Sequence, residues 1–158
     1  LDLNLREGPD NRALAEASLT LADLVKVNDE ELVQLLQWFG APGAHLAAWD
    51  SAAWHVATGA LMARFSVRRL VITRGAQGWT CLDATAGALT GASPPVVVRD
   101  TVGAGDAFAS VLLLGEASGW PLAVTLERAA GFAAQVCTLQ GAAQAGDPLY
   151  ARSRASWS

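Results

Sequence analysis

Two glycines and a carboxylate stand at the start of an apolar helical segment in the stretch Asp100–Phe108, whose sequence is Asp-Thr-Val-Gly-Ala-Gly-Asp-Ala-Phe. Gly103 and Gly105 allow the backbone to approach a ligand closely and to turn its N–H groups toward an anion. The helix that we expect from Gly105 to about Ala117 adds unpaired N–H groups and the positive end of its dipole. The pattern therefore predicts a phosphate site that needs no basic side chain.

Asp106 is the residue of this stretch that could carry out acid–base chemistry. We expect its carboxylate to be buried beside the anion site, where a negative charge is unfavourable unless it has a chemical task. Taking the proton from an attacking hydroxyl group is such a task. The alternative is a glycine-rich turn that an aspartate caps, with no part in chemistry.

Asn28 and Glu31 have the spacing Asn-x-x-Glu at an expected strand end and helix start. This spacing brings both side chains to one side of the first helical turn. An amide and a carboxylate there could order the water shell of Mg²⁺, which keeps several waters when proteins bind it. The alternative is a helix N-cap followed by an acid that suits the helix dipole. Glu31 is not expected to be the base in either interpretation.

Near the N-terminus, Asp2, Asn4 and Arg6 alternate with leucines, which predicts that the three share one face of a short strand. The planar guanidinium of Arg6 could bind two oxygens of a phosphate or of an acid sugar at once. A solvated strand end is the alternative.

The stretch Asp100–Phe108 resembles the signature of the ribokinase-like (pfkB-type) carbohydrate kinases, and all nine residues fit the family pattern. The resemblance implies ATP as the phosphoryl donor, Mg²⁺ as the metal and a sugar hydroxyl as the acceptor. Asp106 would be the base for that hydroxyl, and Asn28 and Glu31 would tune the binding of magnesium and phosphate. The anion hole for the transferred phosphoryl group would consist of Gly103, Ala104 and Gly105.

Three further segments resemble parts of the same family. Asp2–Arg6 resembles the Asp-x-Asn-x-Arg segment of fructokinase-like and 2-keto-3-deoxygluconate kinase-like members, which makes Asn4 and Arg6 candidate contacts of a substrate or phosphate. Ala133–Gly141 would cover the adenine. The turn that borders the nucleotide, Thr-x-Gly-x-x-Gly, would be formed by Thr73, Gly75 and Gly78. An ordinary strand–turn–strand connection is the alternative for that turn.

The resemblance extends to the loops that bind potassium in some members of the family. One carboxylate and several backbone carbonyl groups would surround the ion. The residues at these positions are Asp100, Val102, Val136, Leu139 and Gly141. Those relatives often add a hydroxyl ligand where this chain has Ala145.

The length, composition, net charge and cysteine spacing of the chain limit the kinds of protein that it can be. The chain has 158 residues, the size of one domain, and with 52% hydrophobic and 16% charged residues it is typical of a globular protein. A net charge of −4 argues against a nucleic-acid partner. No apolar run is long enough to span a bilayer, and no signal peptide is visible. Cys81 and Cys137 lie far apart, which favours free thiols in a reducing cytoplasm.

Strand and helix signals alternate along the chain, which predicts an α/β fold in three layers, with a mainly parallel sheet flanked by helices. Ligands bind at the carboxyl ends of the strands in such sheets. Expected helices span residues 11–22, 29–39, 51–65, 105–117 and 122–139, and expected strands span 1–4, 23–27, 70–73, 79–82 and 96–98.

The chain opens on Leu1–Asn4 as if a core strand were already under way, without an initiator Met. Members of the family that it resembles run to about twice this length. We therefore expect residues 1–158 to be the C-terminal portion of a kinase domain, with the ATP site and the catalytic loop but an incomplete sheet. A homodimer is expected only at full length, because family dimers usually form through the part that is missing here.

The sequence as a whole predicts a cytoplasmic, ATP-dependent carbohydrate kinase of the fructokinase or ribokinase type, with a sugar and ATP as its small-molecule partners. A 2-keto-3-deoxygluconate kinase or a nucleoside kinase of the same fold is one alternative. A nucleotide-binding fragment without catalysis is the other. Two competing phosphate motifs are missing: there is no Gly-x-x-x-x-Gly-Lys-Ser/Thr loop, and Phe108 replaces the third small residue of a dinucleotide fingerprint.

Overall fold

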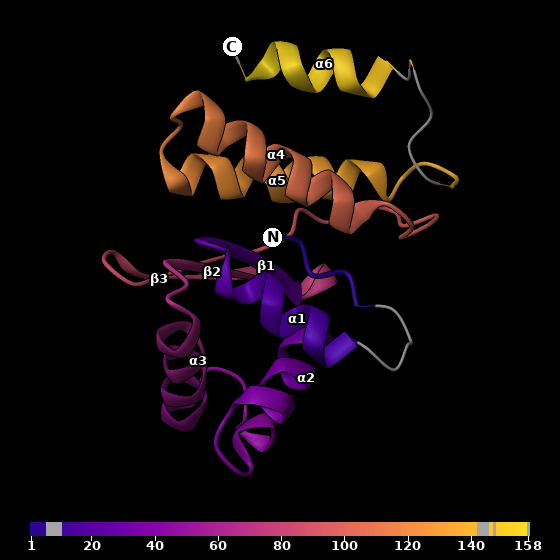
Figure 1. Ribbon diagram of the computed structural model, residues 1–158. Coiled ribbons are helices and arrows are strands. Elements are labelled where there is room, and N and C mark those ends of the chain that lie inside the picture. The colour runs from indigo at the N-terminus through magenta and orange to yellow at the C-terminus, as the bar shows by residue number, and fades with distance from the viewer. Residues whose placement is uncertain (6–10, 142–145, 147, 158) are drawn as a thin grey trace. The chain divides into compact units, whose positions relative to one another are not determined.

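The structure of the chain is a computed structural model that describes residues 1–5, 11–141, 146 and 148–157 (Figure 1). Its contacts form two compact units. The first unit comprises residues 1–74 and 80–90, and the second comprises residues 75–79 and 91–158.

A four-stranded sheet belongs almost wholly to the first unit. Its strands are β1 (Leu24–Asn28), β2 (Arg69–Thr73), β3 (Trp79–Asp83) and β4 (Gly87–Gly91), in the order β1-β2-β3-β4. β1 and β2 are parallel, and their last residues, Asn28 and Thr73, are paired. The connections from β2 to β3 and from β3 to β4 are too short for a parallel crossover, so these strands are antiparallel. Within this chain the sheet is therefore mixed.

Three helices of the first unit cover one face of β1 and β2: α1 (Asn11–Thr20), α2 (Asp29–Phe39) and α3 (Ala52–Phe65) (Figure 1). Because successive strand residues point to opposite faces, Val25 and Val27 of β1 enter the same core as Leu70 and Ile72 of β2. This core fixes the strands whose carboxyl ends carry Asn28 and Thr73.

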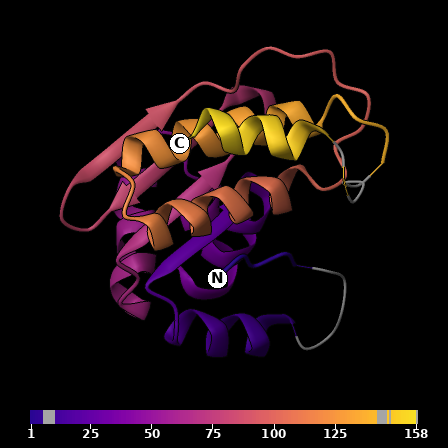
Figure 2. The ribbon, with the colours of Figure 1, turned by 90° about the horizontal axis from the view of Figure 1, so that it is seen from above.

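The second unit is built on two adjacent helices, α4 (Ala104–Ser118) and α5 (Leu122–Val136). They approach closely at Gly115, where a Cβ atom would lie 2.3 Å from the Cγ2 of Thr125. A third helix, α6 (Pro148–Ser156), follows. The ring of Phe132 lies 5.7 Å from those of Tyr150 and Trp157, measured between centroids. Figure 2 shows α4 and α5 side by side, with α6 overlying α5 in this view.

The expected α/β fold with a helix-flanked sheet is confirmed, and two of the expected strands are wrong. Residues 96–98 pair with no strand, and Val97 and Val98 are exposed, because the chain leaves the sheet at β4 and enters Pro94-Pro95, which cannot donate ladder hydrogen bonds. Residues 1–4 make a single parallel bridge, from Asp2 to Lys26. Four elements were not expected from the sequence: β4, α6 and the short 3₁₀ helices η1 (Ala44–Leu46) and η2 (Gly75–Gln77).

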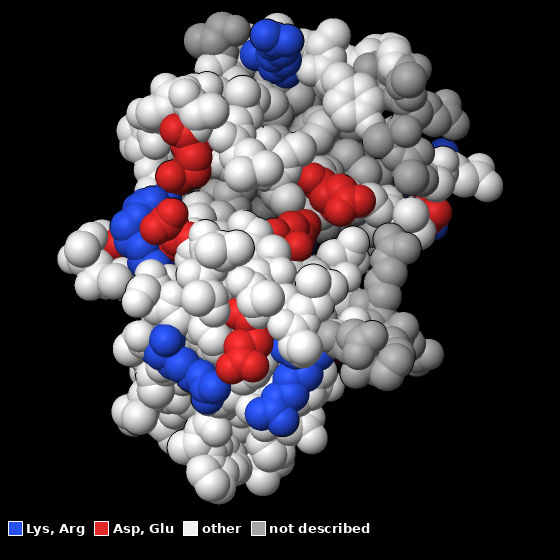
Figure 3. All heavy atoms as spheres, viewed as in Figure 1, with Lys and Arg blue, Asp and Glu red and all other residues white. Residues whose placement is uncertain are grey.

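The surface carries few charges, in keeping with the composition. On the face drawn in Figure 3, acidic and basic side chains are interspersed among other residues.

Among the described helices, none combines the length and the apolar character that a membrane crossing requires.

Candidate active site

The start of α4 has the geometry of an anion site. Gly103 precedes the helix with φ 84° and ψ −5°, the left-handed conformation that glycine adopts without strain, and no side chain caps the helix. The N–H of Ala104 donates to the carbonyl of Thr101 at 3.2 Å. The N–H groups of Gly105 and Asp106 have no hydrogen-bond acceptor within the described part of the chain. Two of these amides are thus free to bind an oxyanion.

Asp106 lies in the first turn of α4 and is exposed, so the expectation of a buried carboxylate is wrong. The apolar stripe of the helix explains its exposure. Ala107, Phe108 and Val111 are buried, whereas Ser110, one turn after Asp106, is exposed. The carboxylate therefore stands at the anion-binding end of the helix on a face that a substrate could reach.

The side chain of Asp100 accepts hydrogen bonds from the loop before α4 and from the loop after α5. Its Oδ1 accepts from the N–H of Val102 and its Oδ2 from the N–H of Gly141, both at 3.0 Å. These hydrogen bonds, chiefly the one from Val102, hold the pKa of Asp100 below its usual value. Burial, assisted by the negative charge of Asp100, raises the pKa of the Cys137 thiol.

The five residues of the predicted potassium site are therefore brought together only in part. Asp100, Val102 and Gly141 share hydrogen bonds, and Leu139 donates its N–H to the carbonyl of Val136 at 3.0 Å. Ala145 lies outside the described residues. Potassium binding stays a prediction, and the carboxylate and carbonyl groups found here are the oxygen donors that such an ion needs.

The turn from Thr73 to Gly78 follows β2. The hydroxyl of Thr73 donates to the carbonyl of Val27 at 3.4 Å, across the pair of parallel strands. Gly78 has φ 91°, and a Cβ atom there would lie 2.0 Å from the carbonyl oxygen of Gly91. Ser93 donates to the carbonyl of Gly75 at 2.7 Å. Glycine is thus required at position 78 by conformation and by space, and the predicted nucleotide contact of this turn is not tested by these bonds.

Asn28 and Glu31 form a capping box at the start of α2. The N–H of Glu31 donates to Asn28 Oδ1 at 2.7 Å, and the N–H of Asn28 donates to Glu31 Oε2 at 2.8 Å. The other carboxylate oxygen, Oε1, accepts from the N–H of Leu5 at 2.9 Å. The helix-cap alternative is therefore confirmed. The magnesium role stays a prediction that is compatible with it, because each carboxylate oxygen keeps a second lone pair.

We expect Glu31→Ala to lower the free energy of unfolding by about 1–3 kcal/mol, because the N–H groups of Leu5 and Asn28 both lose their acceptor. Urea unfolding measures the loss, and hydrogen exchange at the Leu5 amide should accelerate. Glu30→Ala is the matched control, since Glu30 is exposed in the same helical turn. Equal stability of the two variants would contradict this role of Glu31.

Asp2 and Asn4 do not share one strand face as the sequence predicts. Asp2 bridges to β1 and forms an ion pair with Lys26, at 3.1 Å between Oδ1 and Nζ. Asn4 then takes a φ of 41°, which ends the extended alternation, and its side chain is exposed. Asparagine adopts this conformation more readily than most residues, and the sequence pattern gave no sign of it. Arg6 lies outside the described residues.

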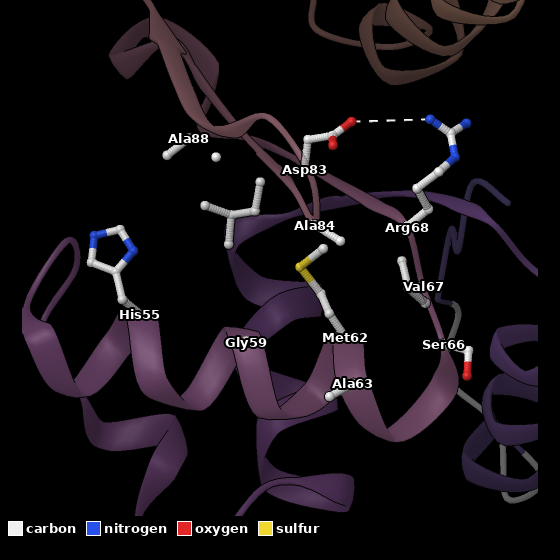
Figure 4. Close-up of a pocket in the computed structure, with 12 residues that line it drawn as sticks. His55, Gly59, Met62, Ala63, Ser66, Val67, Arg68, Asp83, Ala84 and Ala88 are labelled. Carbon is white, nitrogen blue, oxygen red and sulfur yellow. Dashed lines mark ion pairs between the residues drawn. The ribbon is translucent and has the colours of Figure 1, made fainter.

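A cavity of about 610 Å³ lies between α3 and the hairpin of β3 and β4 (Figure 4). Apolar groups dominate its wall, and His55, Met62, Arg68 and Asp83 contribute to it. Its lining contains none of the described residues that the sequence places in the phosphate, magnesium or nucleotide sites. The cavity is thus separate from the chemistry proposed on sequence grounds.

Sequence reasoning missed one group at the carboxyl end of β2. The guanidinium of Arg74 stacks on the ring of Trp49, with 4.0 Å between Cζ and the ring centroid. The two residues are far apart in sequence, and no local motif connects them. The position of Arg74 directly after Thr73 was the only available signal.

Comparisons with known proteins identify relatives of this chain. The model of the pfkB family of carbohydrate kinases matches residues 2–148. A fructokinase from Rhizobium leguminosarum bv. trifolii is 34% identical over 118 residues, which are 72% of this chain and 32% of the fructokinase. An aminoimidazole riboside kinase from Salmonella enterica, solved with aminoimidazole riboside and an ATP analogue, is 31% identical, with a TM-score of 0.70 over 96% of this chain and 50% of its own.

A third relative shows the fold alone. Phosphofructokinase-2 from Escherichia coli, in complex with potassium, is 23% identical, with a TM-score of 0.70 over 90% of this chain and 44% of its own. The chain thus spans about half or less of the length of the proteins that it matches. Its helix-flanked sheet has the ribokinase-like fold, and with a family match over nearly its whole length the chain belongs to the pfkB family of carbohydrate kinases.

Proposed function

We propose that the protein to which this chain belongs transfers the γ-phosphoryl group of ATP to a primary hydroxyl group of a sugar, as a fructokinase- or ribokinase-like enzyme. The observation that carries the proposal is the start of α4. There a left-handed Gly103, the unpartnered amides of Gly105 and Asp106 and an accessible Asp106 carboxylate stand within one helical turn.

At this turn the Asp106 carboxylate and the backbone amides have different roles in the reaction. Asp106 takes the proton of the sugar hydroxyl as its oxygen attacks the γ-phosphorus, so that a new P–O bond forms and ADP leaves. The amides of Gly105 and Asp106, with the positive end of the helix dipole, stabilise the negative phosphoryl oxygens. No proton donor is needed for ADP, whose terminal phosphate leaves as an anion.

Magnesium would be held mainly through the phosphates. The described residues contain no cluster of three or more His, Cys, Asp or Glu side chains that could hold a metal, and Mg²⁺ in phosphoryl-transfer sites takes few protein ligands. Asn28 and Glu31 would contact its waters. When bound, the ion would neutralise phosphate charge. Potassium, near Asp100, would be a second ion with a structural role.

For the molecule that accepts the phosphoryl group, we propose a chemical class rather than a single compound. A fructokinase and an aminoimidazole riboside kinase are among the relatives above 30% identity, so fructose and a riboside are the first candidates. An acid sugar such as 2-keto-3-deoxygluconate is the third, because the Asp2-x-Asn4-x-Arg6 segment resembles that branch. We further propose a cytoplasmic protein that forms a homodimer at full length.

A nucleotide-binding fragment without catalysis is the second candidate. One observation favours it: the chain covers only 32% of the fructokinase and 50% of the aminoimidazole riboside kinase. The remaining parts of those two proteins lie outside the match. In that case weak ATP binding would occur without sugar phosphorylation.

The deciding experiment is magnesium- and ATP-dependent phosphorylation of fructose, ribose, 2-keto-3-deoxygluconate and adenosine. It should be run on this chain and on a version extended through any upstream coding sequence. We expect activity in the extended form. ATP binding without phosphorylation in either form would establish the second candidate, and a strong preference for adenosine would move the assignment to nucleoside kinases.

A further inference from the structure

Arg74 is held on an aromatic platform at the carboxyl end of β2. Its guanidinium stacks on Trp49, and the ring of Trp49 lies 4.5 Å from that of Trp54, measured between centroids. Trp54 is 3% exposed and belongs to the core of the first unit. The position of the guanidinium is therefore set by a rigid support rather than by a flexible surface contact.

The guanidinium of Arg74 has no hydrogen-bond partner among the described residues. No carboxylate or carbonyl of the described residues accepts a hydrogen bond from it, and its buried Nε atom is unsatisfied. Other arginines of the same unit are paired: Arg64 with Glu16 at 3.3 Å, and Arg69 with Asp83 at 3.0 Å. A guanidinium that lies over a ring keeps its N–H groups in its own plane and directed away from its centre, where they can bind two oxygens of one anion. A buried donor without an acceptor calls for such an explanation.

The location of Arg74 identifies the anion. Arg74 directly follows Thr73, which pairs with Asn28 of the capping box. Neighbouring strands lie about 4.8 Å apart, so Arg74 and the proposed magnesium motif occupy adjacent strand ends on the edge where parallel sheets bind ligands. The anion that belongs there is a phosphate of a magnesium-bound polyphosphate.

We propose that Arg74 is a phosphate-binding residue that contacts the polyphosphate chain of the nucleotide, and that Trp49 is the positioning residue that orients it. The identity of the nucleotide rests on the proposed function, whereas the anion site rests on the contacts of Arg74 alone. A free polyphosphate and the phosphates of ATP share this chemistry, and the test separates them.

The test is calorimetric titration of tripolyphosphate, magnesium-ATP and adenosine into the natural protein at its full length. Arg74→Met should weaken the binding of tripolyphosphate and of ATP by about tenfold or more, because two charge-assisted hydrogen bonds are lost, and should leave adenosine binding unchanged. Arg74→Lys should restore part of the affinity, and Trp49→Ala should weaken polyphosphate binding less than Arg74→Met does. The matched control is Arg128→Met, since Arg128 also stacks on a tryptophan, Trp120, at 4.2 Å in the second unit.

Each outcome separates this inference from the proposed function. If Arg74→Met and Arg128→Met bind ATP equally well, Arg74 is no phosphate contact, and the kinase proposal stands. If Arg74 is needed for tripolyphosphate but magnesium-ATP does not bind, the anion site stands and the kinase proposal fails. Absence of any polyphosphate binding by the wild type overturns the inference. If Arg74→Met does not fold, as circular dichroism would show, the neutral variant Arg74→Gln takes its place, and a tripolyphosphate affinity equal to that of the wild type would overturn the inference.

Discussion

Asp106→Asn is expected to lower the rate constant for sugar phosphorylation by about 10²–10⁴-fold or more while ATP affinity stays unchanged. The amide cannot take the proton of the attacking hydroxyl, but it has nearly the same size as the carboxylate. Asp106 is exposed in the first turn of α4, so the exchange leaves no cavity and no buried charge. Binding of ATP should even gain slightly, since a negative charge near the phosphates is removed.

The measurement is kcat with saturating substrates, together with the Kd of ATP, in the form of the protein that phosphorylates a sugar. Glu116→Gln is the control, because it makes the same acid-to-amide change at an exposed position of the same helix. We expect that variant to retain normal turnover. An Asp106→Asn enzyme with near-normal kcat would show that another group takes the proton.

Local patterns in the sequence were sufficient wherever the structure depends on local interactions. The paired glycines before an apolar run predict the start of α4, and Gly103 indeed takes the left-handed conformation there. Asn28, three residues before Glu31, predicts a cap, and the capping box is present. The apolar residues around Val25 and Val71 predict two buried strands, and both strands are present.

Such local patterns do not predict interactions between segments that are distant in the sequence. The bond from Leu5 to Glu31 and the stack of Arg74 on Trp49 each join residues about 25 positions apart, with no periodic signal between them. The valines at 96–98 have strong strand propensity, but a strand also needs a neighbour with free hydrogen-bonding groups, and this segment has none within the described residues. Propensity is therefore overridden by tertiary context at these positions.

A second large effect is expected at Asp83, at the end of β3. Its carboxylate accepts from the N–H and hydroxyl of Thr85 at 2.9 and 2.8 Å, from the N–H of Ala86 at 3.0 Å and from Arg69 Nε at 3.0 Å. Asp83→Ala should lower the free energy of unfolding by about 3 kcal/mol, because it leaves the buried guanidinium of Arg69 without this partner. Urea unfolding measures the loss, and Asp23→Ala, at an exposed position, is the control.

The same contacts predict how the loss depends on pH. Hydrogen bonds from Thr85, then from Ala86 and Arg69, hold the pKa of Asp83 far below its usual range. A carboxylate with a lowered pKa in the folded state adds stability that is complete above its unfolded pKa of about 3.9, and this stability declines as the pH falls toward the folded value. The difference between wild type and Asp83→Ala should therefore be constant from about pH 7 to pH 5 and should shrink below about pH 4. A difference that grows on acidification would mean that the carboxylate is protonated in the folded protein, which its four hydrogen-bond donors do not allow.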